Sequence, residues 1–94
     1  MEEKKNFSRA HVKLYGKVQN VGFRFFINRK ASGAGLVGWV RNANGFVEVV
    51  LEGEKETIKN CIEECRRGPM FSKVQKVNID WGQPTGEFIR FEVR

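Results

Sequence analysis

Residues 10–24 have the sequence AHVKLYGKVQNVGFR, in which a strand pattern leads directly into a helix pattern. Apolar residues alternate with polar ones from Ala10 to Val18, which is the period of a strand with one buried face. After Gly22, apolar residues recur at spacings of three and four up to Ala34, which is typical of an amphipathic helix. The segment therefore predicts a strand, a short glycine-containing loop and a helix.

A hairpin and a second helix are predicted downstream of this segment. Residues 36–41 and 46–52 are rich in β-branched and aromatic side chains, which favours strands. They flank Asn44-Gly45, a dipeptide that supplies the positive φ values of a tight hairpin turn. Residues 54–67 carry apolar side chains at helical spacing, with acidic residues early and basic residues late, as the helix dipole favours. Gly68-Pro69 is expected to end this helix.

Two more strands are expected after the second helix, over 74–81 and 88–93. The resulting order is β-α-β-β-α-β with an additional C-terminal strand. Because each helix has a single apolar stripe, both helices are expected to pack on one face of an antiparallel sheet. This order predicts an α+β fold of the ferredoxin-like split β-α-β type, with one domain over 9–94 and a flexible polar tail over 1–8.

Length and composition limit the possible functions. Ninety-four residues with 40% hydrophobic side chains suffice for a single globular domain with a modest core. No stretch reaches the roughly 18 apolar residues of a membrane span. The first residues also lack the apolar core of a signal peptide, so we expect a cytoplasmic protein with no membrane partner. The net charge of +6 favours an anionic partner, and a small anion is as compatible as a polyanion because the basic residues are dispersed.

The side chains that usually carry catalysis are sparse. His11 is the single histidine and lies within the first predicted strand, with no further metal-ligand residue at suitable spacing. Cys61 and Cys65 are four residues apart in the second helix pattern, which is too far for a disulfide, and we expect two buried thiols. The sequence contains neither the G-x-x-x-x-G-K-[ST] motif of nucleotide-binding proteins nor the G-x-S-x-G motif of serine hydrolases. An enzyme of this sequence is expected to work without a metal, a cofactor, a histidine base or an activated nucleophile.

Two segments could bind or act on an anion. The first is the loop that enters the first helix, because a glycine-containing loop at a helix N-terminus directs free backbone N–H groups outward. Arg24 lies where its guanidinium could hold the same anion with two hydrogen bonds. Alternatively, Gly22 only permits a tight turn and Arg24 is solvated. The second segment ends at Asn42, whose amide could face the loop; alternatively, Asn42 caps its own turn.

Together the two segments resemble the acylphosphatase family. Residues 16–24, GKVQNVGFR, are similar to the family motif G-x-V-Q-G-V-x-F-R, and residues 38–42, GWVRN, are similar to the second family motif. The likeness runs from about residue 10 to the end of the chain. It implies a ferredoxin-like fold that hydrolyses the carboxyl–phosphate bond of small acyl phosphates to a carboxylate and inorganic phosphate, without a metal or a covalent intermediate.

The resemblance also implies roles for individual residues. The phosphoryl group would be bound by the loop residues Gln19, Asn20, Val21, Gly22, Phe23 and Arg24. Asn42 would orient the attacking water, so Arg24 and Asn42 are the expected catalytic residues. The sequence departs from the family at Asn20, where glycine is usual, and in the hairpin after Asn42, which is one residue shorter. If position 20 has a positive φ, asparagine is the least costly substitute for glycine there.

Two other functions are compatible with the predicted fold. The two departures from the family pattern also fit a module that binds phosphate without hydrolysing it. The element order and the positive charge occur in RNA-binding domains of the RRM type as well. Residues 46–52 argue against RNA binding. In an RRM the corresponding strand starts with a basic residue, a glycine and an aromatic residue, whereas these residues lack that start and include two acidic side chains. We therefore expect a protein that binds an acyl phosphate and inorganic phosphate but no nucleic acid. Because the single domain has a polar surface and no identifiable apolar patch, we expect it to be a monomer.

Overall fold

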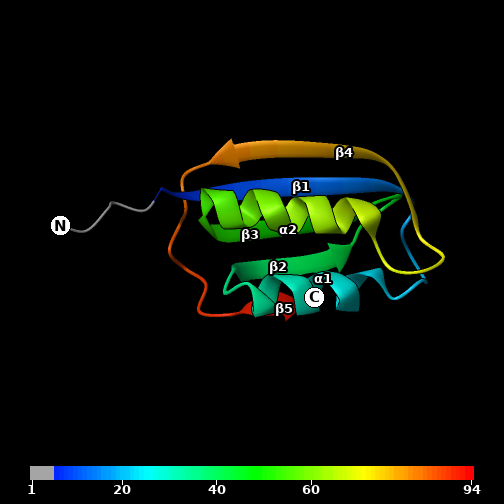
Figure 1. Cartoon of the computed structure of the whole chain (residues 1–94), viewed down its shortest axis with the longest axis horizontal. Helices are drawn as coiled ribbons and strands as arrows, with labels where there is room; N and C mark the ends of the chain where they lie inside the picture. The colour runs from blue at the N-terminus through cyan, green and yellow to red at the C-terminus, as the bar shows by residue number, and fades with distance from the viewer. Residues whose placement is uncertain (1–5) are drawn as a thin grey trace.

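Five strands and two helices form the regular structure of residues 6–94, the part of the chain that this computed structural model describes (Figure 1). In chain order they are β1 (Phe7–Lys17), α1 (Phe23–Gly33), β2 (Val37–Asn42), β3 (Val47–Glu54), α2 (Lys55–Arg67), β4 (Lys73–Gly82) and β5 (Phe91–Val93). β1 begins inside the segment expected to be a tail, because Phe7 pairs with Glu54. Residues 1–5 of that segment lie outside the described residues. Within residues 6–94, neither helix has the length and apolarity that crossing a bilayer requires.

The strands form one sheet in the order β4-β1-β3-β2-β5. β1 pairs antiparallel with β3 and β4, and β2 pairs antiparallel with β3. β5 runs parallel to β2, so the prediction of a wholly antiparallel sheet is wrong at this edge. The direction follows from the route of the chain, because residues 83–90 stay at the end of the sheet where β4 finishes and β2 starts (Figure 1).

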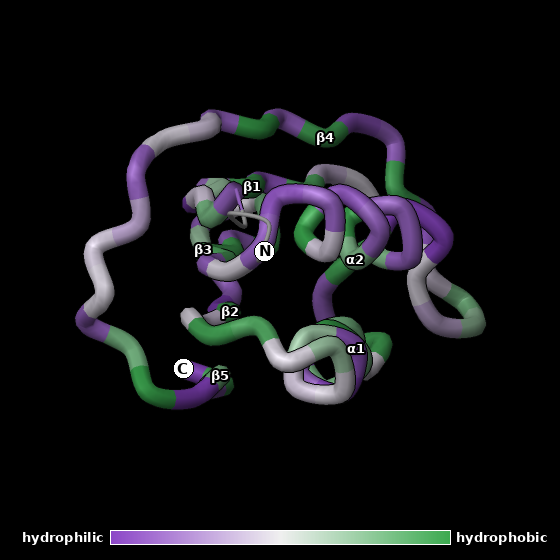
Figure 2. Tube along the Cα trace, turned by 60° about the vertical axis from the view of Figure 1, so that its left-hand side comes forward, coloured by the Kyte–Doolittle hydropathy of each residue, from purple (hydrophilic) through white to green (hydrophobic). Residues whose placement is uncertain are grey.

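Both helices lie on one face of the sheet, as predicted, and Figure 2 shows the helical layer beside the strands. α1 packs on β2 and β5, and α2 packs on β1, β3 and β4. The apolar stripes of the helices are buried against the strands, as Ile27 of α1 and Ile58 of α2 illustrate. Cys61 and Cys65 are buried free thiols, which confirms that prediction. The fold is α+β and ferredoxin-like, with its core between the helices and the sheet.

The C-terminal third of the chain is less buried than its sequence pattern predicts. β5 is limited to three residues, and Ile89, expected to lie in this strand, is 83% exposed. Trp81, at the end of the strand expected over 74–81, is 38% exposed because it lies near the end of the edge strand β4. The Lys55 ammonium lies 4.9 Å from the centroid of the Trp81 ring. This tryptophan therefore forms a cation–π contact at the margin of the core.

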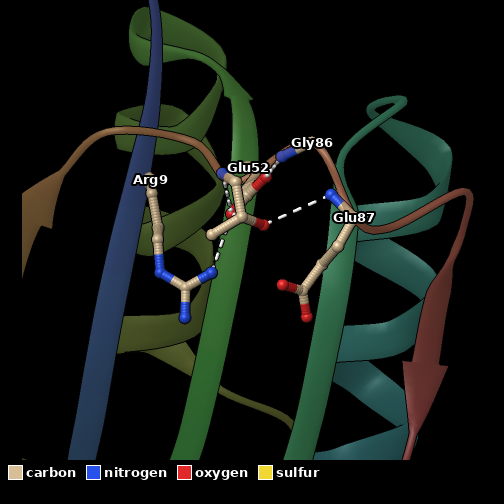
Figure 3. Close-up of polar contacts among 5 residues, drawn as sticks. Arg9, Glu52, Gly86 and Glu87 are labelled. Carbon is tan, nitrogen blue, oxygen red and sulfur yellow. Dashed lines mark hydrogen bonds and ion pairs between the residues drawn. The ribbon is translucent and has the colours of Figure 1, made fainter.

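Glu52, on the middle strand β3, binds the connection 83–90 through hydrogen bonds (Figure 3). It is 3% exposed. Its carboxylate accepts hydrogen bonds from the Arg9 guanidinium (2.7 Å), the Thr85 N–H and hydroxyl (2.9 and 3.1 Å) and the Gly86 N–H (3.2 Å). Burial raises the pKa of Glu52, but these hydrogen bonds outweigh burial and hold the pKa below its usual 4.5. The contact secures the end of the sheet where β1 and β2 start.

Candidate active site

The loop after β1 and the hairpin after β2 lie at the same end of the sheet. β1 and β2 are both antiparallel to β3, so they run in the same direction with one strand between them. β1 ends at Lys17 and β2 ends at Asn42. Their connections emerge at the same end of the molecule, on the right of Figure 1. The topology therefore brings together the two segments that the sequence singles out.

Gly16 allows β1 to pass into the loop. The pairing of β1 with β4 shifts register between Tyr15 and Gly16, and Gly16 has φ 127°. A Cβ atom at this position would lie 2.2 Å from the Lys73 carbonyl oxygen, so no larger residue fits without moving β4. Val18 then buries its side chain in the core. The loop therefore starts from a fixed position at the end of the sheet.

Two residues of the loop adopt left-handed backbone conformations. Asn20 has φ 63° and Gly22 has φ 75°, so Asn20 occupies the kind of position that asparagine tolerates best among non-glycine residues. Gly22 is the N-cap of α1, and its carbonyl oxygen accepts the hydrogen bond of the Phe26 N–H (3.0 Å). The N–H groups of residues 23–25 precede that bond and have no acceptor within the helix. The helix dipole adds partial positive charge there, which suits an anion.

Arg24 projects from the first turn of α1 and is half-buried. Within residues 6–94 its guanidinium forms no ion pair and no hydrogen bond, and it lies 5.9 Å from the centroid of the Phe25 ring. Its N–H donors are therefore available to a ligand at the start of the helix. A free guanidinium beside free backbone N–H groups attracts an anion.

Asn42 is the last residue of β2, opposite Val47 of β3, and it is exposed. The hairpin is closed by a backbone hydrogen bond from the Ala43 N–H to the Phe46 carbonyl oxygen (2.8 Å). In the described part of the chain, the Asn42 amide makes no hydrogen bond, so the alternative that it caps its own turn is not supported. Its donor and acceptor are free at the end of the molecule that carries the loop.

The Gln19 side chain links the loop to the hairpin. Its amide nitrogen donates hydrogen bonds to the carbonyl oxygens of Ala43 (2.8 Å) and Phe46 (3.0 Å). Sequence reasoning assigned Gln19 only to the phosphate loop and missed this contact. The available signal is a long amide side chain in the short loop between the strand pattern and the helix pattern. Its partners could not be inferred, because they lie 24 and 27 residues further along the chain.

Comparison with known proteins agrees with this geometry. The acylphosphatase family model matches residues 10–93. The chain belongs to the acylphosphatase family. An acylphosphatase of Moorella thermoacetica is 46% identical over 80 residues, which cover 84% of this chain and 86% of that protein. The crystal structure of acylphosphatase from Bacillus subtilis has a TM-score of 0.89 at 31% identity and covers 93% of this chain and 98% of that one. The structure of an acylphosphatase from Coxiella burnetii has a TM-score of 0.88 at 35% identity and covers 99% of this chain and 100% of that one.

The apolar side chains of the loop are part of the core. Phe23 is buried and Val21 packs against the buried cluster, so both residues offer only their backbone to a ligand. Gly68, which follows α2, lies so close that a Cβ atom there would be 2.9 Å from the Phe23 ring. The structure thus places the loop backbone, Arg24 and Asn42 at one end of the molecule and adds the side chain of Gln19.

A separate cluster of charged groups lies on the face of the sheet opposite the helices. The Glu48 carboxylate contacts His11 Nε2 (2.6 Å) and accepts a hydrogen bond from Arg41 (2.7 Å). Sequence spacing does not reveal this partner of His11, because Glu48 comes from the neighbouring strand β3. Burial raises the pKa of Glu48, but the hydrogen bonds with His11 and Arg41 lower it below its usual value. Among residues 6–94, no three His, Cys, Asp or Glu side chains are grouped to hold a metal.

Proposed function

We propose that this chain hydrolyses the carboxyl–phosphate bond of small acyl phosphates and releases a carboxylate and inorganic phosphate. The observation that carries the proposal is the position of Arg24 and the free N–H groups at the start of α1, at the same end of the molecule as the free amide of Asn42. The loop can bind a phosphoryl group, and the amide can hold a water molecule next to it. Membership of the acylphosphatase family supports the same reaction.

Arg24 and the loop backbone bind the phosphoryl oxygens in this proposal. The N–H groups of residues 19–23 and the guanidinium fork of Arg24 supply donors to the equatorial oxygens. The left-handed turns at Asn20 and Gly22 orient the backbone donors before the substrate arrives, which reduces the reorganisation needed on binding. The net charge of +6 favours encounter with an anionic substrate.

Asn42 orients the attacking water in this proposal. Its amide oxygen accepts a hydrogen bond from the water, so that a lone pair of the water oxygen faces phosphorus. As the new P–O bond forms, the bond from phosphorus to the acyl oxygen breaks, its electron pair leaves with the carboxylate, and a water proton passes to phosphate or solvent. A leaving group whose acid has a pKa of about 4 to 5 departs without a general acid. Positioning and charge stabilisation therefore suffice.

We further propose that the enzyme acts as a monomer, without a metal or a cofactor, and that it binds no nucleic acid. Glu48 lies on the middle strand β3, on the face of the sheet opposite the helices, where an RRM would stack RNA bases. A module that binds phosphate without turnover is the remaining alternative, because Asn20 and the short hairpin depart from the family pattern.

Hydrolysis of benzoyl phosphate in the presence of EDTA tests the proposal. Wild-type protein and Arg24→Ala are compared, and both are checked for folding by circular dichroism. Chelator-resistant turnover that is lost in Arg24→Ala supports hydrolysis at this site. Phosphate binding without turnover in folded wild-type protein would favour the binding module instead.

A further inference from the structure

The Gln19 amide occupies the opening of the hairpin that follows Asn42. Its two acceptors are the carbonyl groups of Ala43, the residue after Asn42, and of Phe46, the residue before β3. The Phe46 oxygen also accepts the hydrogen bond from the Ala43 N–H that closes the turn. A side chain of the loop thus completes the hydrogen-bond pattern of the hairpin.

Each end of this link is attached to a buried residue. Val18 precedes Gln19, Val47 follows Phe46, and both valines are buried. Asn20 and Gly22 in the loop and the turn residues 44–45 in the hairpin are exposed. Within residues 6–94, the loop and the hairpin share no hydrogen bond other than the two of Gln19. The separation of the two tips therefore depends on this side chain.

The chemistry of the link requires an amide of this length. Both acceptors are carbonyl oxygens, so one nitrogen must supply two N–H donors. A glutamate side chain has no donor when it is ionised, and a methionine side chain of similar length has none. An asparagine side chain has the donors but is one methylene shorter, so it does not span the same distance.

We propose that Gln19 is a positioning residue for hydrolysis, because its side chain holds Asn42 in place relative to the phosphate loop. The inference rests on the proposed function, in which the loop binds the phosphoryl group and Asn42 orients the water. The distance from water to phosphorus then depends on the link between loop and hairpin. A misplacement of about 1 Å costs about 100-fold in rate. The Gln19 side chain touches neither reacting atom, so it acts through Asn42.

A double-mutant cycle between Gln19→Met and Asn42→Ala tests this role on benzoyl phosphate. Gln19→Met should lower kcat by about 10- to 100-fold. The inhibition constant of inorganic phosphate should change by less than about 3-fold, because Arg24 and the loop N–H groups remain. In the Asn42→Ala background, Gln19→Met should change kcat by less than about 3-fold, because the water is no longer held. Gln83→Met, an exposed glutamine at the other end of the sheet, is the matched control and should keep the wild-type kcat.

The comparison of wild type with Arg24→Ala is made first, so a failure of the proposed function is seen without any Gln19 variant. The positioning role is overturned if Gln19→Met lowers kcat equally in both backgrounds, which indicates a general structural effect. It is also overturned if phosphate inhibition weakens as much as kcat falls. Gln19→Asn is the second variant if Gln19→Met does not fold. A loss of kcat in Gln19→Asn with unchanged phosphate inhibition supports the positioning role, and a wild-type kcat in this variant refutes it.

Discussion

Asn20 and Gly22 share the left-handed backbone conformation, with φ 63° and 75°, on either side of Val21. These two turns lie in the short segment that carries the chain from the end of β1 at Lys17 to the start of α1 at Phe23. The first N–H groups of α1 follow directly and have no acceptor within the helix. Glycine adopts this conformation freely and asparagine does so at a small cost. The shape of this loop therefore depends on the identity of these two residues.

Asn20→Ala should lower the free energy of unfolding by about 1 kcal/mol, whereas Asn20→Gly should stay within about 0.5 kcal/mol of wild type. Alanine keeps the Cβ atom that disfavours a positive φ but lacks the short polar group that offsets the cost. Urea unfolding measures both values. Inhibition by inorganic phosphate should weaken in Asn20→Ala and persist in Asn20→Gly. An Asn20→Ala protein as stable as wild type would contradict the strain at this position.

Arg24→Ala should abolish turnover of benzoyl phosphate and leave the free energy of unfolding within about 0.5 kcal/mol of wild type. Arg24 is half-buried and has no ion pair in the described residues, so little stability depends on it. Arg24→Lys keeps the positive charge but loses the planar guanidinium that can donate two parallel hydrogen bonds, so this variant should recover only part of the activity. Measurements of kcat/KM and urea midpoints distinguish these effects. Arg29→Ala, an exposed arginine in the same helix, is the control and should remain active.

Asn42→Ala should lower kcat far more than it weakens inhibition by inorganic phosphate. The expected reason is that Asn42 contacts the water rather than the phosphoryl group. Steady-state kinetics with benzoyl phosphate, together with phosphate inhibition, measure both quantities. Asn44→Ala alters an exposed residue at the tip of the same hairpin and should keep the wild-type kcat. Comparable losses in kcat and in phosphate affinity would argue against a role in water positioning.

Glu52→Gln should destabilise the protein by about 1 to 3 kcal/mol at neutral pH, because a charged acceptor of four hydrogen bonds is lost. The pKa of Glu52 in the folded protein lies below 4.5, the value of the unfolded chain. The stabilisation is therefore complete above that value and is lost as the pH falls through the folded pKa.

Urea midpoints measured between about pH 3 and neutrality check this sign. The midpoint of wild type should fall with decreasing pH, and the midpoint of Glu52→Gln should fall less steeply. The kcat of the folded variant should stay near wild type, because Glu52 lies at the end of the sheet away from the loop. An unchanged pH dependence in the variant would show that Glu52 does not contribute to acid sensitivity.

The sequence by itself determined the elements, the fold class and the candidate residues of the site. The alternation from Ala10 to Val18 and the helical spacing over 54–67 reflect which side of each element meets the core. Such patterns depend on neighbours in the chain, so they can be read without the fold. Arg24 and Asn42 lie at the start of a helix and at the end of a strand, and these local boundaries also have sequence signals.

Only the tertiary structure decided which distant segments meet. The parallel direction of β5 depends on the path of residues 83–90 around the sheet. The contact of Glu52 with Arg9 joins residues 43 positions apart, and the contact of Gln19 with Ala43 joins residues 24 apart. A hydrogen bond requires its two heavy atoms to lie about 3 Å apart in a suitable direction. Strand register and chain path set such distances, and no local period in the sequence encodes them.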